Sequence, residues 1–260
     1  MKILITGANG VIGKFLSNKL KDHDVYIPRR SCVDFTNRDH VDTLFNSHDK
    51  FDLVLHCAVK GGNRLYHDSW DVLNDNLKMY YNILYHKNNY TKFITFGSGA
   101  EIYMPDSPYG LSKKAISKSI LDQFNFYNIR IFGLFGEGEL DTRFIKANLD
   151  RYYQHKPIEI YQNKMMDFFY IEDLWKVVQY YITTELPPKE TDCCYKESKY
   201  IDLLDISNII NNLDNHTVDI IVKNKELSPS YIGQHNKLGI EFIGLEKGLK
   251  LEYEKYKLCN

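Results

Sequence analysis

The spacing of apolar positions predicts a chain in which strands and helices alternate. Lys2–Thr6 is a short run of branched apolar residues, typical of a strand that is buried on both faces. Behind it, Phe15, Leu16 and Leu20 recur at helical spacing. Further strands are expected over 24–28, 51–57, 92–96 and 129–132, and helices over 38–45, 69–86 and 113–124. This alternation predicts a Rossmann-like α/β fold with a doubly wound parallel sheet.

The alternation becomes less regular after about residue 136. A helix is still expected over 141–154, a strand over 158–161 and a helix beginning near Asp173, but only short elements after about residue 200. We therefore expect two parts. The first is an NADP-binding Rossmann domain over 1–137, which is rejoined by about 166–195. The second is a smaller substrate-binding lobe formed by 138–165 and 196–260.

Composition narrows the classes of protein that fit. The chain has 260 residues, of which 43% are hydrophobic, enough for a sizeable core. Its net charge of −1 gives no support for a nucleic-acid or membrane surface. The 5 cysteines include no C-x-x-C pair, so no metal site is expected. No signal peptide or apolar stretch of about eighteen residues is present, which favours a cytoplasmic protein.

A glycine-rich turn directly follows the first strand and leads into the first helix. Its spacing is G-x-x-G-x-x-G, with Gly7 for the tight turn, Gly10 for close approach of a pyrophosphate and Gly13 for helix–sheet packing. The helix N-terminus then faces the phosphates with its partial positive charge. The residues expected to bind a dinucleotide here are Gly7, Asn9, Gly10, Val11, Ile12 and Gly13.

A second chemical signal is the pair Tyr109 and Lys113. The two residues lie four apart at the start of an expected helix, so their side chains share one face. An ammonium near a phenol favours the phenolate, which lets the tyrosine exchange a proton at neutral pH. Ser98 follows the preceding strand and is the expected third member of the site.

Together these features resemble the extended short-chain dehydrogenase/reductase family, the NAD(P)-dependent epimerases, dehydratases and reductases of nucleotide sugars. The resemblance extends over nearly the whole chain and rests on segments 6–13, 33–36, 56–58, 96–103, 108–113, 130–136 and 167–173, with Asn76 at the position of a family asparagine. Within the family, Ala58-Val59-Lys60-Gly61-Gly62 is most similar to GDP-fucose synthase and its 4-keto-sugar reductase relatives.

The resemblance implies roles for individual residues. Tyr109 is the general acid/base toward a sugar C4 oxygen, Ser98 hydrogen-bonds that oxygen, and Lys113 holds the nicotinamide ribose. The other cofactor-binding residues that it implies are Asp34 and Phe35 at the adenine, and Ala58 and Lys60 near the nicotinamide ribose.

The chain departs from the family pattern at several positions. Counting back from Tyr103 places Gly99, not Ser98, at the usual hydroxyl position. Glu101 stands where sugar 4,6-dehydratases have a catalytic glutamate, and both a substrate contact and a capping role stay open. Met166 replaces an arginine that grips the diphosphate, for which Arg143 or Lys164 could substitute.

These observations predict an NADP(H)-dependent oxidoreductase that reduces the C4 keto group of a nucleotide-linked 6-deoxy sugar in activated-sugar (polysaccharide) biosynthesis. The alternative is a nucleotide-sugar 4-epimerase, or epimerase/reductase, with tightly bound NAD. A non-catalytic NADP-binding regulator is a third reading, against which the intact Tyr109 and Lys113 argue.

Two further expectations concern the cofactor and the assembly. Arg29 and Arg30 stand just past the second strand, where NAD enzymes usually place an acidic residue, so we expect NADP(H) to be preferred, with NAD as the alternative. A homodimer is expected through the helices beginning at Ser69 and Lys113. The candidates for its seam are Tyr80, Tyr81 and Leu84.

Overall fold

The computed structural model describes residues 1–63, 66–196, 201–226, 228–235 and 237–259. The chain divides into two compact units. Unit 1 contains Met1–Arg130 and Gln179–Thr191, and unit 2 contains Ile131–Val178 and Asp192–Asn260.

Unit 1 is built on a sheet whose described strands number six, in the order β2-β1-β3-β4-β5-β9. The strands are β1 (Lys2–Thr6), β2 (Asp24–Tyr26), β3 (Phe51–His56), β4 (Tyr90–Ser98), β5 (Phe126–Ile131) and β9 (Glu190–Cys193). β1 pairs in parallel with β2 on one side and with β3 on the other, and β3 pairs in parallel with β4. These pairings confirm the predicted parallel, doubly wound sheet. Because the strand order reverses between β1 and β3, a ligand crevice is expected at their carboxyl ends.

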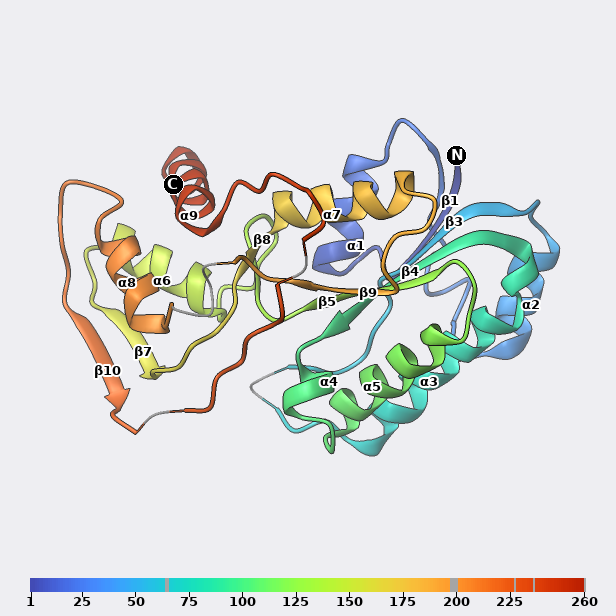
Figure 1. Ribbon diagram of the computed structural model, residues 1–260, viewed down its shortest axis with the longest axis horizontal. Helices are drawn as coiled ribbons and strands as arrows, with labels where there is room; N and C mark the ends of the chain where they lie inside the picture. The colour runs from blue at the N-terminus through green and yellow to red at the C-terminus, as the bar shows by residue number, and fades with distance from the viewer. Residues whose placement is uncertain (64–65, 197–200, 227, 236, 260) are drawn as a thin grey trace. The chain divides into compact units, whose positions relative to one another are not determined.

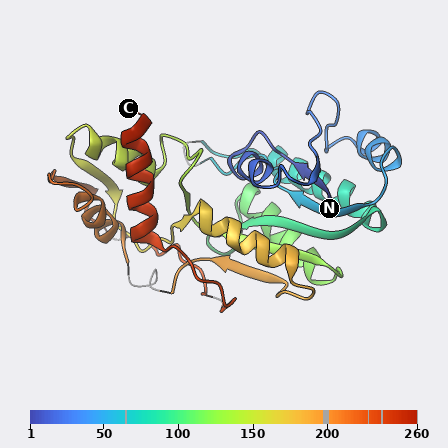
Figure 2. The same ribbon diagram turned by 90° about the horizontal axis from the view of Figure 1, so that it is seen from above.

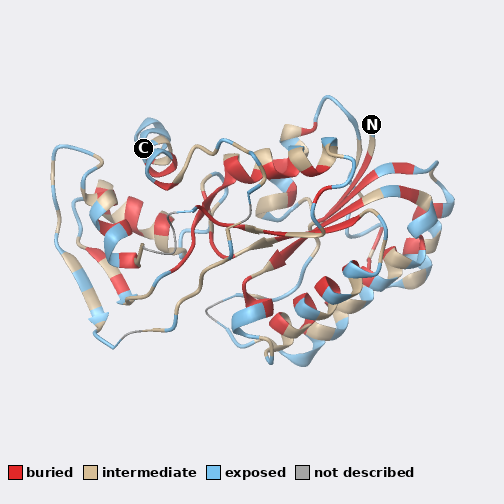
Figure 3. Ribbon diagram, in the orientation of Figure 1, coloured by how far each residue is buried: buried red, intermediate tan, exposed pale blue. Residues whose placement is uncertain are grey.

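The helices of unit 1 cover both faces of this sheet. They are α1 (Val11–Lys19), α2 (Arg38–Asn46), α3 (Trp70–Tyr85), the short α4 (Ala100–Tyr103) and α5 (Pro108–Leu121), with a 3-10 turn, η1, at Lys87–Asn89. α3 and α5 run side by side beneath the sheet, and α1 lies on its other face (Figure 1). The central strands are almost entirely buried, whereas the outer faces of α2 and α3 are exposed (Figure 3).

Two details of these helices differ from the expectations. α5 begins at Pro108 rather than near Lys113, because the Ser107 hydroxyl accepts the backbone N–H of Gly110 at 3.0 Å and proline suits the first helical turn. Tyr80 does not lie on the outer face of α3. Its side chain is fully buried and its hydroxyl donates to Ser119 Oγ of α5 at 3.1 Å, so Tyr80 is wrong as a seam residue.

Unit 2 has smaller sheets and more helix than expected. Its elements are β6 (Leu134–Phe135), α6 (Phe144–Tyr153), β7 (Ile158–Gln162), β8 (Phe169–Tyr170), α8 (Leu203–Asn211), β10 (Ile220–Asn224) and α9 (Leu245–Cys259). α7 (Ile171–Thr183) begins in unit 2 and ends in unit 1. β10 pairs in parallel with β7, and β6 with β8. Within the described residues no helix is long and apolar enough to cross a membrane.

The last helix, α9, is the main element that the sequence did not predict. Figure 2 shows it along its length, ending at the C-terminus. It packs on α6 through Tyr256, whose hydroxyl donates to Asp150 and whose ring lies 4.2 Å from the Lys146 ammonium. Leu249 and Tyr253 of α9 are buried.

The chain leading into α9 is anchored by Asp173 of α7, which is fully buried. Its carboxylate accepts the Tyr195 hydroxyl at 2.7 Å and the backbone N–H groups of Ile243 and Gly244 at 2.8 and 3.0 Å. The Lys176 ammonium lies 3.2 Å away. One carboxylate thus ties the first turn of α7 to two later segments of the chain.

Candidate active site

The glycine turn has the shape that a pyrophosphate requires. A Cβ at Gly7, whose φ is +66°, would lie 2.5 Å from Ala58 N, and one at Gly13 would lie 2.4 Å from Gly7 O. At Gly10, by contrast, the nearest atom in the described chain would be Gly7 O at 3.4 Å. Packing therefore requires Gly7 and Gly13, whereas Gly10 leaves room for a ligand.

The N-terminus of α1 faces this open position. Asn9 and Gly10 are exposed, Val11 and Ile12 are half-buried, and no side chain of the described residues caps the helix. Unpartnered N–H groups at a helix start are a ready anion site. The residues present thus fit a dinucleotide phosphate.

The carboxyl ends of β1 and β3 are joined by a residue that the sequence analysis did not single out. Thr6 Oγ1 accepts the Ala58 N–H at 3.1 Å and lies 2.9 Å from Nδ1 of His56. Burial lowers the pKa of His56 to about 3, so its imidazole is neutral at physiological pH. Thr6 therefore brings Ala58 against Gly7, at the point where the strand order reverses.

The segment after β2 brings Arg30 close to Asp34. Hydrogen bonds from the backbone N–H and the hydroxyl of Thr36 lower the pKa of Asp34, and the Arg30 guanidinium lowers it further. Arg29 and Arg30 are both exposed. Phe35 is buried in the core, and its carbonyl accepts Asn82 Nδ2 at 2.9 Å.

Lys60 is held at its backbone rather than at its ammonium. Asn76 Oδ1 accepts the Lys60 N–H at 2.8 Å, and Asn76 Nδ2 donates to Lys60 O and to Ser112 Oγ, each at 3.0 Å. The Lys60 side chain is exposed and pairs with Asp75 at 2.7 Å. Asn76 is buried, and its hydrogen bonds to Lys60 and Ser112 fix the segment after β3 to α5.

Tyr109 and Lys113 lie on one face of α5, as their spacing predicts. The Lys113 ammonium lies 5.8 Å from the centre of the Tyr109 ring and donates to Phe96 O at 2.6 Å. Burial lowers the pKa of Lys113 to about 8. The ammonium is thus held out of water, directly beside the phenol ring.

Gly62 is a further residue that the sequence analysis missed as part of this site. A Cβ on Gly62 would lie 2.8 Å from Cζ of Tyr109, so the ring packs directly on this backbone. Asp68 holds the position by accepting the Gly62 N–H at 3.0 Å. The φ of Gly62 is +74°, which a residue with a side chain rarely adopts. The glycine pair in the sequence was the available signal.

Ser98 ends β4, and its surroundings are set by Glu101. The Ser98 hydroxyl accepts the Ala100 N–H at 3.2 Å, and the Ser98 N–H donates to Glu101 Oε1 at 2.8 Å. Arg130 Nε donates to Glu101 Oε2 at 2.9 Å, and its Nη2 donates to Glu190 Oε1 at 3.0 Å. Glu101 is buried, and each of its carboxylate oxygens accepts a hydrogen bond from within unit 1.

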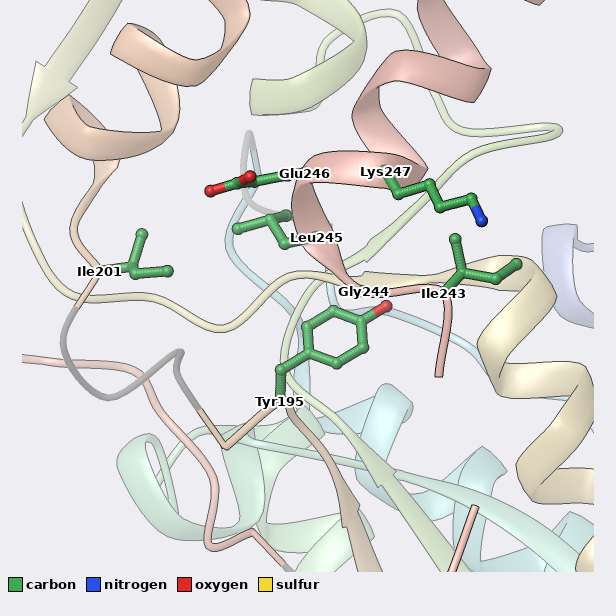
Figure 4. A pocket seen from close by; sticks show the side chains of 7 residues that line it. All are labelled: Tyr195, Ile201, Ile243, Gly244, Leu245, Glu246 and Lys247. Atoms are coloured by element: carbon green, nitrogen blue, oxygen red, sulfur yellow. The ribbon is translucent and has the colours of Figure 1, made fainter. Parts of the chain in front are cut away.

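Unit 2 holds the residues considered for a diphosphate. Met166 is buried, Arg143 precedes α6, and the Lys164 ammonium lies 5.8 Å from the Tyr231 ring centre. The unit also has a pocket of about 330 Å³, which contains none of the predicted site residues (Figure 4). Its lining is formed by Tyr195, Ile201, Ile243, Gly244, Leu245, Glu246 and Lys247. In the described parts of both units, no group of three or more His, Cys, Asp or Glu residues could hold a metal.

Three features define a dinucleotide-binding protein of the epimerase/reductase class. They are a six-stranded parallel sheet among the described strands, the glycine turn behind β1 and the Tyr109–Lys113 pair. The chain belongs to the NAD dependent epimerase/dehydratase family, whose model matches residues 3–193. This confirms the resemblance that the sequence motifs indicated.

The chain is similar to several enzymes that act on nucleotide-linked sugars. Over 131 residues the chain is 30% identical to GDP-L-colitose synthase from Yersinia pseudotuberculosis, a match that spans 48% of this chain and 42% of that enzyme. The fold is similar to that of a GDP-mannoheptose C4 reductase from Campylobacter jejuni with NADP bound (TM-score 0.78, 20% identity, 98% of each chain covered). It is equally similar to UDP-glucose 4-epimerase from Thermotoga maritima (TM-score 0.78, 17% identity, 100% of this chain and 99% of that chain covered).

Proposed function

We propose that this protein is an NADP(H)-dependent oxidoreductase that reduces the C4 keto group of a nucleotide-linked 6-deoxy sugar in the cytoplasm. The observation that carries the proposal is the buried Lys113 ammonium beside the Tyr109 ring, in the same unit as the open N-terminus of α1. The names of the relatives, a GDP-colitose synthase and a GDP-heptose C4 reductase, support a nucleotide-linked sugar as substrate. We further propose that unit 2 is the substrate-binding lobe.

The proposed mechanism assigns proton handling and positioning to this chain. When bound, NADPH would supply the hydride. Tyr109 would donate a proton to the C4 oxygen, and Ser98 would hold that oxygen through its hydroxyl. Lys113 would hold the nicotinamide ribose and favour loss of the Tyr109 proton through its charge. The segment containing Gly62 would fix the Tyr109 ring so that its hydroxyl keeps one orientation.

The direct test is a screen of 4-keto-6-deoxy sugars on different nucleotides that follows NADPH oxidation. We expect at least one to be reduced, with free exchange of NADPH. A protein that purifies with tightly bound NAD and interconverts C4 epimers would instead be the alternative epimerase, whose fold this chain shares.

The cofactor preference is expected to depend on the arginines after β2. Arg30→Ala should weaken NADPH binding by about 10–100-fold, because a charge-assisted bond to the 2′-phosphate contributes roughly 1.5–3 kcal/mol. NADH binding should stay unchanged. Arg29→Ala measured in the same way would show which arginine contributes more. The control is Arg38→Ala, which removes a guanidinium that pairs with Asp42 on α2. Equal affinity of the unmodified protein for NADP and NAD by titration would contradict this preference.

The lowered pKa of Lys113 predicts how cofactor binding depends on pH. Lys113 is charged below about pH 8 and neutral above it, so the Kd for NADPH should be constant below that pH and rise above it. Fluorescence titration between pH 6 and pH 10 measures this. Lys113→Met should bind weakly without the pH dependence, whereas Lys114→Met, an exposed neighbour, should keep it. A flat profile in the unmodified protein would contradict the assignment.

The same shift affects stability with a definite sign. The pKa of Lys113 in the folded protein, about 8, lies below its ordinary value of 10.5. Between these values the unfolded chain binds more protons, so the free energy of unfolding should rise with pH over that range. Lys113→Met should lack this rise, which comparison of urea unfolding at about pH 8 and pH 10 would show.

We also propose a homodimer through the outer face of α3. Trp70 and Tyr81 of this face are exposed, although Tyr80 is not available. Tyr81→Asp should convert a dimer into a monomer by placing a charge in the seam. Light scattering at micromolar concentration measures this, and Tyr161→Asp, which alters an exposed side chain of β7, serves as control. A monomer mass for the unmodified protein would refute the dimer.

A further inference from the structure

The carboxyl end of β4 extends past its neighbour β3. The last residue of β3, His56, is opposite Thr95, so Phe96, Gly97 and Ser98 lie beyond the paired region. Residues two apart in a strand direct their backbone groups to the same edge. Phe96 O and the Ser98 N–H therefore lie along one edge of β4, where an ammonium and a carboxylate bind them.

Those two side chains are Lys113 and Glu101. Lys113 Nζ donates to Phe96 O at 2.6 Å, and Glu101 Oε1 accepts the Ser98 N–H at 2.8 Å. Because a strand rises about 3.3 Å per residue, the two positions are only about 7 Å apart along β4. Both side chains are buried, so water screens their attraction weakly.

The charges around this pair balance. Arg130 lies between the carboxylates of Glu101 and Glu190, with N–O distances of 2.9 and 3.0 Å. One guanidinium thus faces two carboxylates, and Lys113 supplies the second positive charge. Glu190 also accepts the Ser117 hydroxyl of α5 and Asn128 Nδ2.

Apart from Glu101, the titratable groups that face Lys113 are two neutral side chains and the phenol of Tyr109. His56 at the end of β3 and Cys57 directly after it are both held neutral, since burial lowers the pKa of the imidazole to about 3 and raises that of the thiol. Tyr109 lies on the same helix. Burial raises the pKa of Glu101, and Arg130 and Lys113 oppose that rise. Glu101 is thus the carboxylate that compensates the buried ammonium.

We infer that Glu101 is a positioning residue, which holds Ser98 by its backbone and keeps Lys113 in the ammonium form through its negative charge. It is not a base toward the sugar, because both its oxygens are bound by Ser98 and Arg130 within unit 1. The inference rests on the proposed function, because that function gives Ser98 and Lys113 their catalytic roles. The effect of the Glu101 charge on the protonation of Lys113, however, is a property of the protein without cofactor or substrate.

The test is the titration of Lys113 in the cofactor-free protein, followed by NMR of ¹³C-labelled lysine Cε and assigned with Lys113→Met. Glu101→Gln should lower the midpoint by about one pH unit, since an opposite charge nearby favours the charged form. The same variant should lower, by the same amount, the pH above which the Kd for NADPH rises. Glu190→Gln removes the other carboxylate bound to Arg130 and should shift the midpoint by less than half as much.

An unchanged midpoint in folded Glu101→Gln would overturn the inference. If that variant does not fold, Glu101→Asp provides the second measurement. It should keep the midpoint and lower turnover, because the charge stays while the shorter side chain withdraws from Ser98; a lowered midpoint would overturn the inference. Deuterium at C3 or C5 of the product, incorporated from deuterated water and lost in Glu101→Gln, would show a base and likewise overturn it. The NMR midpoint needs no sugar, so its failure is distinct from failure of the proposed reaction.

Discussion

Tyr109→Phe should lower turnover by about 10²–10⁴-fold, the usual contribution of a positioned general acid. The variant retains the ring, which packs on Gly62 and lies 5.8 Å from the Lys113 ammonium, so the shape of the site is preserved. The missing hydroxyl acts mainly in the transition state. NADPH affinity should therefore stay within about twofold of that of the unmodified protein.

Two measurements separate these effects. Single-turnover oxidation of NADPH in the presence of the keto sugar gives the chemical step, and fluorescence titration gives cofactor affinity. Tyr161→Phe is the matched control, because it removes a hydroxyl from a tyrosine that is 75% exposed on β7. A turnover of Tyr109→Phe within about tenfold of normal would place the proton donor elsewhere.

Asp173→Ala should lower the free energy of unfolding by about 3–5 kcal/mol, the range for removing one member of a buried charged pair. Its carboxylate, fully buried, accepts the Tyr195 hydroxyl and two backbone N–H groups and faces the Lys176 ammonium. Without the carboxylate, these donors lose their acceptor, and the buried Tyr195 hydroxyl retains its desolvation cost. An acidic residue in the first turn also favours α7 through the helix dipole.

Urea unfolding followed by circular dichroism measures this loss. Asp173→Asn should cost less, since the amide oxygen still accepts hydrogen bonds while the charge opposite Lys176 is lost. Asp219→Ala, an exposed aspartate of the same unit, should change stability by less than about 0.5 kcal/mol. A loss below about 1 kcal/mol for Asp173→Ala would mean that these hydrogen bonds are replaced by water.

Local pattern was enough to predict the elements around the cofactor turn. The apolar run of β1 and the helical spacing of α1 are properties of near neighbours in the chain, and so is the four-residue spacing of Tyr109 and Lys113. These features depend on backbone geometry alone. Their positions were therefore predicted correctly, with shifts of a few residues at the element ends.

Local pattern was insufficient where a helix has two apolar sides or few buried positions. Tyr80 and Tyr81 are adjacent in α3, yet Tyr80 is buried against α5 and Tyr81 is exposed, and counting residues does not reveal which side the sheet covers. In α9 the buried positions Leu245, Leu249 and Tyr253 are separated by charged residues, Gly248 and Leu251. Their i, i+4, i+8 spacing was the signal that could have predicted the helix.

By itself, the sequence determined the kind of protein: a parallel α/β chain with a cofactor turn behind its first strand and a tyrosine–lysine pair on one helix face. The tertiary structure decided which distant residues complete the site. Thr6 meets Ala58 because β1 pairs with β3, and Gly62 meets Tyr109 because Asp68 holds its loop. Arg130 joins Glu101 to Glu190 because β5 and β9 are neighbours in the sheet. Such contacts depend on which strands pair over long sequence separations, and local periodicity carries no information about that choice.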